Sequence, residues 1–532
     1  MKRVIWVLSG SFALGFWSEV FAESFGCPYF SPNPMSVKSF AKTYGGTSWD
    51  EVSSVQQTSD GGYILAGYTS SFGAGSYDIF FIKTDENGNI SWTKTYGGAG
   101  GDFSYSVQQT SDGGYIVAGG TNSFGAGGLD IFLIKTDADG NIIWAKTYRG
   151  TGDEWARSVH QTSDGGYILA GATNSFSAGG YDILLIKADA NGNIIWTKTY
   201  GGTNYEDAYF VQQTSDGGYI VVGATNSFGA GGHDIFLIKT DANGNIIWTK
   251  TYGGTNYDYA YSVQQTSDGG YIVAGLTTSF GASGYDIFLI KTDGNGNIIW
   301  TKTYRGTYED GAYYVQQTSD GGYILAGYTS SFGAGGYDVF LIKTDANGNL
   351  QWTKTYGGTD DEQAYFVQQT FDGGYIVAGR TRSFGAGGWD AFLIKTDANG
   401  NIGSCSIVQD ASPTETTPSP TVNTPYPSVS SLSFTVNSPS PTLTSPTLTV
   451  SEPCPLSISE SCQIARGIIM PYKGGIKVRG SGEFEVKVYN VSGVMVKSVK
   501  GKDEVKLELS RGVYFVEVVS GGKVLRERVI IR

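Results

Sequence analysis

The motif Asp-Gly-Gly-Tyr occurs seven times in this chain, and every interval between its copies is 52 residues. A constant period of this length indicates a propeller, a solenoid or another array in which each unit packs only against its neighbours. Glycine accounts for 78 of the 532 residues and tyrosine for 35, which favours tight turns between short strands over helices. The copies begin at Asp60, Asp112, Asp164, Asp216, Asp268, Asp320 and Asp372.

Each repeat contains four segments with the composition of β-strands. In the first copy these are residues 52–58, 63–69, 78–84 and 90–96. Short turns that contain Gly61-Gly62 and Asn87-Gly88 join the first pair and the last pair, as in β-hairpins. Four antiparallel strands per repeat predict an all-β fold with a seven-bladed β-propeller over residues 36–405. A β-solenoid is the alternative, although solenoid repeats are usually shorter.

The two ends of the array indicate how the ring closes. A tryptophan stands at one position of the fourth strand, and we interpret it as packing between blades. One period before the first tryptophan lies Phe40, in a segment with the same pattern, whereas one period after the last the pattern has decayed at Ser404. The N-terminal strand is therefore expected to complete the seventh blade and remove its open edge. The tryptophans are Trp92, Trp144, Trp196, Trp248, Trp300 and Trp352.

Residues 1–22 have the organisation of a secretory signal peptide. Basic residues at the start precede an apolar run from Val4 to Trp17, and we place the cleavage site after Ala22. The run is short for a membrane span, and we predict no transmembrane segment once it is removed.

All four cysteines lie outside the repeats. An even number of cysteines in an exported protein suggests disulfide bonds. We predict a bond between Cys27 and Cys405, which flank the array, and a bond between Cys454 and Cys462, which would close a small loop.

The composition changes after the repeats. Residues 406–462 are rich in Ser, Thr and Pro, which predicts an extended, semi-rigid stalk. Residues 463–532 alternate apolar and polar side chains in segments such as Phe484–Tyr489 and Val513–Val519. This alternation predicts a small C-terminal β-sandwich.

The C-terminal segments carry a family resemblance. The runs Val488–Gly493, Leu507–Val516 and Arg528–Ile531 resemble the type IX (Por) secretion C-terminal sorting domain. The resemblance implies that residues 463–532 engage the secretion machinery as a secretion or anchoring signal, and that the protein is secreted or displayed on the outer cell surface. The repeats resemble bacterial and archaeal surface β-propeller repeats of the Asp-Gly-Gly-Tyr type, which imply no particular activity.

Charge and composition exclude several classes of function. The net charge of −13 disfavours binding to nucleic acid. With His160 and His233 as the two histidines, most histidine-based metal sites and catalytic triads are excluded. No repeat carries an insertion or a distinctive catalytic grouping, so we predict that the protein is not an enzyme. A polysaccharide-degrading hydrolase or lyase is the alternative, because paired carboxylates such as Asp153-Glu154 are present.

The seven copies differ most in the loop after the fourth strand. This loop and the loop between the second and third strands leave the blade on one face, here called the long-loop face, and propellers commonly bind ligands there. One loop position is acidic in every copy. Clustered carboxylates can bind Ca²⁺, but we favour capping of the local turn, because a seven-fold ring is wide and does not converge on one ion. We therefore predict no cofactor and no metal. The acidic residues are Asp50, Asp102, Glu154, Glu206, Asp258, Asp310 and Glu362.

Aromatic residues on the same face are further candidates for ligand contact, because exposed rings stack on sugars or anchor protein partners. Burial in the core is the alternative for them. These candidates are Trp49, Tyr77, Phe103, Trp155, Tyr181, Tyr205 and Trp389. The sequence thus predicts an exported surface propeller that binds a glycan or a surface protein without catalysis. A structural coat or spacer protein without a specific ligand is the second hypothesis.

Overall fold

The structure is a computed structural model that describes residues 39–457 and 469–531, apart from residues 126–127, 178, 282–283, 404, 424–427, 431–434, 438–441, 445–447, 473–474, 491–494, 510–511 and 521–522. Residues 38–457 form one compact unit and residues 458–532 belong to a second. The proposed signal peptide, Cys27 and Cys462 lie outside the described residues. Among the described residues, no helix has the length and apolar character needed to cross a membrane.

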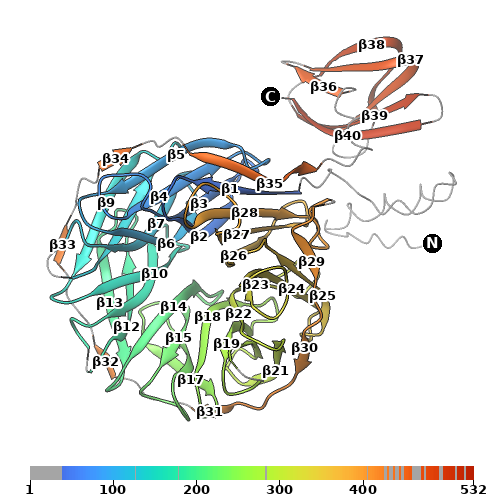
Figure 1. Ribbon diagram of the computed structural model, residues 1–532. Helices are drawn as coiled ribbons and strands as arrows, with labels where there is room; N and C mark the ends of the chain where they lie inside the picture. Colours follow the sequence, from blue (N-terminus) through green and yellow to red (C-terminus); the bar gives the residue numbers. More distant parts are fainter. Residues whose placement is uncertain are drawn as a thin grey trace, which may run out of the picture. The chain divides into compact units, whose positions relative to one another are not determined.

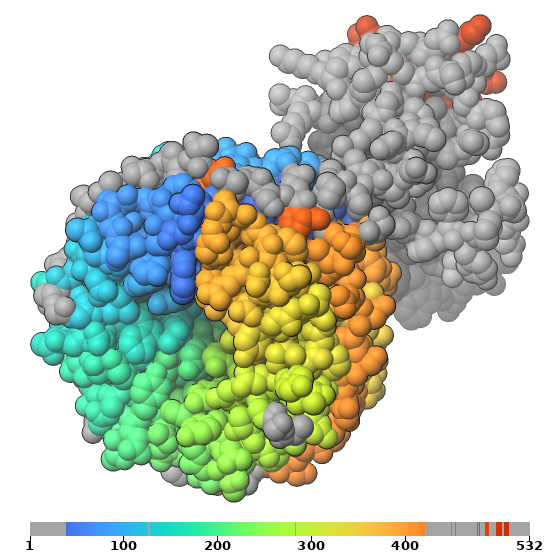
Figure 2. Space-filling view, viewed as in Figure 1, coloured from blue at the N-terminus to red at the C-terminus, as the bar shows by residue number. Residues whose placement is uncertain are grey.

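The repeats form seven four-stranded antiparallel sheets arranged as the blades of a propeller, which confirms the predicted fold. The colour in Figures 1 and 2 therefore runs once around the ring from blue to orange. Blades 1 and 2 are β2 (Asp50–Gln57), β3 (Tyr63–Thr69), β4 (Asp78–Thr84), β5 (Ile90–Gly97), and β6 (Asp102–Gln109), β7 (Tyr115–Thr121), β8 (Asp130–Thr136), β9 (Ile142–Arg149). Blades 3 and 4 are β10 (Glu154–Gln161), β11 (Tyr167–Thr173), β12 (Asp182–Ala188), β13 (Ile194–Gly201), and β14 (Glu206–Gln213), β15 (Tyr219–Thr225), β16 (Asp234–Thr240), β17 (Ile246–Gly253). Blades 5 and 6 are β18 (Asp258–Gln265), β19 (Tyr271–Thr277), β20 (Asp286–Thr292), β21 (Ile298–Arg305), and β22 (Asp310–Gln317), β23 (Tyr323–Thr329), β24 (Asp338–Thr344), β25 (Leu350–Tyr356). Blade 7 is β26 (Glu362–Gln369), β27 (Tyr375–Thr381), β28 (Asp390–Thr396) and β1 (Ser39–Gly45).

Strand β1 closes the ring as predicted. It pairs antiparallel with β28, with Phe40 opposite Lys395 and Thr43 opposite Phe392. All seven residues of β1 are buried. The first described strand of the chain therefore supplies the fourth strand of its last blade.

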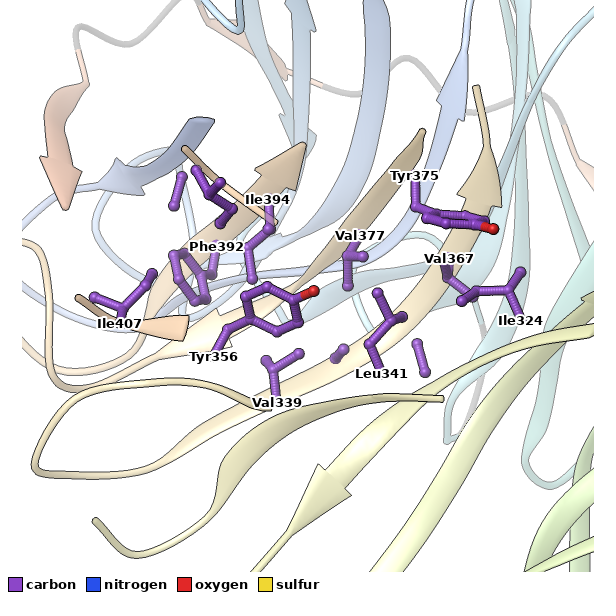
Figure 3. Close-up of a cluster of buried hydrophobic side chains, with 14 residues drawn as sticks. Ile324, Val339, Leu341, Tyr356, Val367, Tyr375, Val377, Phe392, Ile394 and Ile407 are labelled. Atoms are coloured by element: carbon purple, nitrogen blue, oxygen red, sulfur yellow. The ribbon is translucent and has the colours of Figure 1, made fainter. Parts of the chain in front are cut away.

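The hydrophobic core consists of separate clusters, each packed between two neighbouring blades. Figure 3 shows the cluster between blades 6 and 7, in which Leu341 and Tyr356 of one blade meet Val377 and Phe392 of the next. Trp352 packs against this cluster with its ring 5.8 Å from that of Tyr375, and equivalent tryptophan–tyrosine contacts occur at five other junctions. The tryptophans are thus packing residues, as predicted.

Hydrogen bonds reinforce every junction. A buried tyrosine at the end of each outer strand donates its hydroxyl hydrogen to a glycine carbonyl in the last hairpin of the following blade, at 2.6 to 2.7 Å. Tyr44 of β1 makes this bond to Gly88, so the seam between blades 7 and 1 has the same bond as the other junctions.

A ladder of glutamines joins the inner strands on the face of the tight hairpin turns. At six junctions a glutamine side-chain oxygen accepts the backbone N–H of a glutamine in the adjacent blade, at 2.5 to 2.8 Å. His160 occupies the glutamine position in blade 3, so Gln213 of blade 4 lacks that acceptor. A depression of about 580 Å³ lies at this junction, lined by His160 and Gln213 among other polar residues.

Replacing His160 with glutamine is expected to stabilise the propeller. The variant His160→Gln supplies the missing acceptor for Gln213, and one intramolecular hydrogen bond contributes about 0.5–1.5 kcal/mol to the free energy of unfolding. Denaturant titration measures the change. The reciprocal variant Gln212→His breaks the bond to Gln265 at the next junction and should destabilise the protein by a similar amount. A His160→Gln protein less stable than the parent would contradict the claim that these glutamine hydrogen bonds stabilise the propeller.

The segment after the repeats differs from the predicted stalk. Its short strands pair antiparallel with the outer strand of every blade in turn, from blade 6 back to blade 1 and then to β1 of blade 7. Figure 1 shows β29 to β34 at the rim of the ring. We call residues 405–457 the belt. Its strands are β29 (Val408–Asp410), β30 (Thr414–Thr416), β31 (Thr421–Asn423), β32 (Ser428–Ser430), β33 (Thr435–Asn437), β34 (Thr442–Thr444) and β35 (Thr449–Ser457).

The spacing of the belt strands explains how so short a segment reaches all seven blades. From β30 onward each strand begins seven residues after the previous one, so a seven-residue period in the belt matches the 52-residue period of the blades. Backbone pairing satisfies the open edge of each outer strand, an edge that would otherwise be available to other chains. Ion pairs add to the pairing, for example between Lys354 of blade 6 and Asp410 at 2.6 Å.

The second unit is a small antiparallel sheet. Apolar residues of β37, β38 and β39 form its core, among them Val478, Val488 and Val516. The five strands belong to one sheet whose first and last strands, β36 and β40, approach each other, so the sheet curls instead of forming two separate layers. The strands are β36 (Ile469–Tyr472), β37 (Gly475–Asn490), β38 (Met495–Glu508), β39 (Gly512–Ser520) and β40 (Lys523–Ile531).

Candidate functional site

The seven acidic residues of the long loops are fully buried. Asp50 illustrates the arrangement, because it accepts hydrogen bonds from the backbone N–H of Gly46 at 2.7 Å, from the Ser71 hydroxyl at 2.6 Å and from the Thr69 hydroxyl. The carboxylates therefore cap their own loops, which is the interpretation that the sequence favoured over a cation site. Within the described ranges, no group of three or more His, Cys, Asp or Glu side chains is arranged to hold a metal ion.

A second buried carboxyl lies beside the loop carboxylates of Asp50, Asp102, Asp258 and Glu362. Asp338 and Glu362 approach the same α-carbon, that of Gly357, where any side chain would collide with both. Asp338 accepts the backbone N–H groups of Ala334 and Gly335 at 3.1 and 3.4 Å. Burial raises the pKa of Asp338, and the charge of Glu362 raises it further, to about 7. Burial likewise raises the pKa of Asp234 and of Asp390 to about 6.

These carboxyl pairs predict that the propeller loses stability between pH 4 and pH 7. An aspartate in the unfolded chain ionises near pH 3.8, whereas the folded protein holds the Asp338 proton up to about pH 7. The stabilising contribution is therefore complete below pH 3.8 and is lost as the pH rises to 7. The variant Asp338→Asn keeps the acceptor and removes the ionisation, so its melting temperature should exceed that of the parent at pH 7.5 and match it near pH 4.

Thermal melts across this pH range test the expectation. Asp345→Asn is the matched control in the same blade, because Asp345 caps a surface hairpin. Burial opposes a lower pKa there, but hydrogen bonds from the Asn349 side chain and from backbone N–H groups lower the pKa of Asp345. Equal pH profiles for the parent and Asp338→Asn would show that the carboxyl pair does not carry the effect.

Tyrosines line the axis of the ring. One position of the inner strand is tyrosine in five blades. The four rings of blades 4 to 7 touch in succession, with centroid distances of 4.7 Å for Tyr209–Tyr261, 5.1 Å for Tyr261–Tyr313 and 5.4 Å for Tyr313–Tyr365. We call Tyr105, Tyr209, Tyr261, Tyr313 and Tyr365 the axial tyrosine ring. Arg157 takes the tyrosine position in blade 3, and its guanidinium carbon lies 5.7 Å from the ring of Tyr105 and 5.0 Å from that of Tyr209.

A buried ion pair holds Arg157 in this ring. Its Nε and one terminal nitrogen each lie 3.1 Å from Oδ2 of Asp207. Trp155 and Tyr205 donate further hydrogen bonds to Asp207 at 3.2 Å. Asp207 is completely buried while about a third of the Arg157 side chain is exposed (33%). Burial raises the pKa of Asp207, and the arginine opposes that rise.

A second arginine marks the seam between blades 7 and 1. Arg380 lies 2.7 Å from Oε2 of Glu51 and donates to Oε1 of Gln363 at 2.8 Å. Its guanidinium carbon stacks 4.1 Å from the ring of Trp389 and 5.5 Å from that of Tyr365, a member of the axial tyrosine ring. Cation–π contacts of this kind hold the aromatic rings and the guanidinium group in fixed positions relative to each other.

The aromatic residues predicted on the long-loop face gather beside these groups. Tyr77 and Phe103 pack with their ring centroids 5.5 Å apart. Trp155, Tyr181 and Tyr205 form a continuous group with centroid distances of 4.7 and 5.6 Å. Trp389 stacks on Arg380 as described and is nearly buried, whereas Trp49 is 42% exposed. The structure therefore places the predicted aromatic candidates in separate small groups around the ring, and it buries the acidic ones.

The next position of the inner strands is serine in four blades and aromatic in three. The hydroxyl groups of the serines accept a hydrogen bond from the backbone N–H of a valine in a neighbouring blade, at Ser54, Ser106, Ser158 and Ser262. Blades 4, 6 and 7 instead carry Phe210, Tyr314 and Phe366. The ring of Tyr314 contacts that of Phe366 in the adjacent blade and that of Phe210 two blades away.

Sequence reasoning missed the axial tyrosine ring, Arg157 and Arg380. The signal was present in the comparison between copies, because the position reads Ser53, Tyr105, Arg157, Tyr209, Tyr261, Tyr313 and Tyr365, whereas most strand positions hardly vary. This variable position lies inside the inner strand, so a comparison restricted to the loops does not find it. Arg380 lies at another position, in β27.

Comparisons with known proteins bear on both units. The family of secretion system C-terminal sorting domains matches residues 470–532. This chain is a seven-bladed β-propeller that carries a secretion-system sorting domain. The sorting domain marks the propeller for secretion or for display on the cell surface.

Two further likenesses are weaker. The regulatory protein FlaEY of Caulobacter vibrioides is 26% identical over 215 residues, which cover 34% of this chain and 22% of that protein. The chain thus spans about a fifth of the length of this curated relative. A solved structure described as the crystal structure of the eukaryotic initiation factor is 9% identical, with 69% of this chain and all of that chain covered, at a TM-score of 0.30. A score this low supports no argument about the propeller.

Proposed function

We propose that the propeller is a non-enzymatic binding module for a glycan and that the axial tyrosine ring is the centre of its binding site. The observation that carries the proposal is that the blades also differ at the inner-strand position that forms the axial tyrosine ring. Their cores and hairpins are nearly the same, while the residues around the axis on the long-loop side include tyrosine, serine, tryptophan and arginine. A repeat that served only as a spacer would have no reason to vary at a strand position beside the axis while its core strands stay the same.

The chemistry of this place suits a saccharide. Tyrosine and tryptophan offer flat apolar faces together with a hydroxyl or an N–H, and binding sites combine such surfaces with a few fixed polar groups. Arg157 with Asp207 and Arg380 with Glu51 form paired charges, so the site carries fixed hydrogen-bonding groups without a large net charge. This favours a neutral glycan over a protein partner that depends on a charged patch.

The burial of the loop carboxylates argues against catalysis. A glycosidase needs two carboxyl groups free to reach the scissile bond. Glu154 of the pair Asp153-Glu154 and Glu362 of the group Asp360-Asp361-Glu362 are fully buried and hydrogen-bonded within their loops. We therefore propose binding without turnover.

Glycan-array screening of the full chain, followed by titration calorimetry with the best hit, tests this function. Tyr261→Ser and Tyr365→Ser place in blades 5 and 7 the residue that Ser53 supplies in blade 1, and each should weaken binding about tenfold or more, because stacking on an aromatic ring contributes on the order of 1–3 kcal/mol.

Phe371→Ser is the matched control for these variants. Phe371 is 71% exposed at a hairpin turn of the opposite face, where the other six blades carry serine, so its replacement should leave affinity unchanged. An array without a saturable hit, or equal losses for all three variants, would overturn the proposal and favour a structural coat.

The sorting domain gives a separate prediction about export. Deleting residues 463–532 is expected to leave the protein inside the cell envelope, because this region carries the signal that the secretion machinery engages. Cell fractionation with an antibody against the propeller measures the distribution. Surface display of the deleted protein at the level of the parent would show that export does not depend on this domain.

A further inference from the structure

The two ends of the belt meet at blade 7. The belt leaves β28 of that blade, first pairs with β25 of blade 6 and then passes every other blade before β35 pairs with β1. Because β1 is the outer strand of blade 7, the belt returns to the blade from which it started. It therefore makes a full turn around the rim of the propeller.

A cysteine stands at each end of this turn. Cys405 precedes β29 and is half-buried against the cluster between blades 6 and 7, near Ala41 and Ile407. Cys454 lies in β35, opposite Ala41 in the register of β35 with β1. The Sγ atom of Cys405 lies 3.8 Å from the carbonyl oxygen of Pro453, whose peptide bond leads directly to Cys454. The fold thus brings together two cysteines that are 49 positions apart.

We propose that Cys405 and Cys454 form a disulfide bond, which closes residues 405–454 into a covalent hoop around the propeller. This pairing replaces the pairing of Cys27 with Cys405 that their positions in the sequence suggest. In the bond-forming step the two thiols lose two protons and two electrons, and a disulfide oxidant of the extracytoplasmic compartment takes up both and becomes a dithiol. Export through the cell envelope exposes the chain to such conditions.

The hoop gives the belt a stability that its strands lack individually. Most belt strands pair over three residues, as β31 does with β17, and pairing of this length is weak in water. When the ends are joined, a strand that detaches from its blade remains in place beside it, because the loop cannot leave the ring. The cross-link also restricts the unfolded chain, which raises the free energy of unfolding.

Peptide mapping of the unreduced, alkylated protein tests the pairing. Cleavage after Lys, Arg and Glu places the four cysteines in separate peptides, 24–38, 396–415, 416–460 and 461–466. We expect mass spectrometry to find 396–415 linked to 416–460. A link between 396–415 and 24–38, or alkylated Cys405 in the unreduced protein, would overturn the proposal.

A cut in the belt tests the hoop itself. A protease site inserted between β32 and β33 divides the chain into two pieces. With the hoop closed, the pieces stay joined in denaturing electrophoresis without reductant and separate when reductant is added. With the bonds Cys27–Cys405 and Cys454–Cys462 the pieces separate without reductant.

Serine variants provide the energetic test. Cys405→Ser and Cys454→Ser should lower the melting temperature by equal amounts, and the double variant should lower it no further, because each change removes the same bond. Cys462→Ser is the matched control and should leave the melting temperature unchanged. Additive losses for Cys405→Ser and Cys454→Ser would contradict a shared bond.

Discussion

Deleting residues 36–44 is expected to abolish the cooperative unfolding transition of the propeller. The deletion removes most of β1, which pairs with β28 on one side and with β35 on the other. It also removes Phe40 and Tyr44, both fully buried at the junction between blades 7 and 1. Loss of one buried aromatic side chain costs about 3–5 kcal/mol, and a domain is stable by only about 5–15 kcal/mol. Circular dichroism during heating measures the transition.

A point substitution in β1 tests whether this strand closes the ring without shortening the chain. Phe40→Ala should cost about 3–5 kcal/mol in the free energy of unfolding. Trp92→Ala, at the equivalent position of blade 1, is its matched control and should cost a comparable amount, because both rings fill the same place between two blades. A cost for Phe40→Ala near zero, beside a large cost for Trp92→Ala, would mean that β1 is not required to close the ring.

Replacing Arg157 with alanine is expected to destabilise the propeller by about 3–5 kcal/mol at neutral pH. The variant leaves the fully buried carboxylate of Asp207 without the guanidinium that pairs with its negative charge. Protonation of Asp207 relieves the cost, so the loss should shrink as the pH falls. Denaturant titrations at pH 7.5 and pH 5 measure both values.

Adding Asp207→Asn to Arg157→Ala tests whether the unpaired charge is the cause. The asparagine keeps an acceptor for Trp155 and Tyr205 and carries no charge, so the double variant should recover much of the lost stability. A double variant as unstable as Arg157→Ala alone would show that the loss comes from packing against Tyr105 and Tyr209.

The sequence predicted the propeller because its signals are local and repeated. The hairpin turns at Gly61-Gly62 and Asn87-Gly88 set the strand pairs, and Gly61 and Gly88 adopt the positive φ angles that such turns require. The constant 52-residue period makes each blade equivalent to the next. The offset of that period, which begins at Phe40 and ends at Ser404, was enough to place β1 in the last blade.

The belt could not be recognised in the same way. A three-residue strand such as Thr421–Asn423 has too few side chains to show an alternating pattern, and its flanking prolines indicate an extended chain without a partner. The strand forms because β17 offers it an unpaired edge, and that edge exists only after the blade has folded.

The candidate site also has features that the sequence predicted and features that only the folded structure shows. The sequence by itself determined that the blades vary around one face, and it placed aromatic residues such as Trp155 and Tyr181 there. Only the tertiary structure decided that the carboxylates of Asp50 and its equivalents turn into their own loops, because the donors come both from the loop before the strand, as Gly46 does, and from the loop between the second and third strands, as Ser71 does. Only the closed ring brings Tyr209, Tyr261 and Tyr313 into contact, because these residues are 52 positions apart and meet when neighbouring blades share one axis.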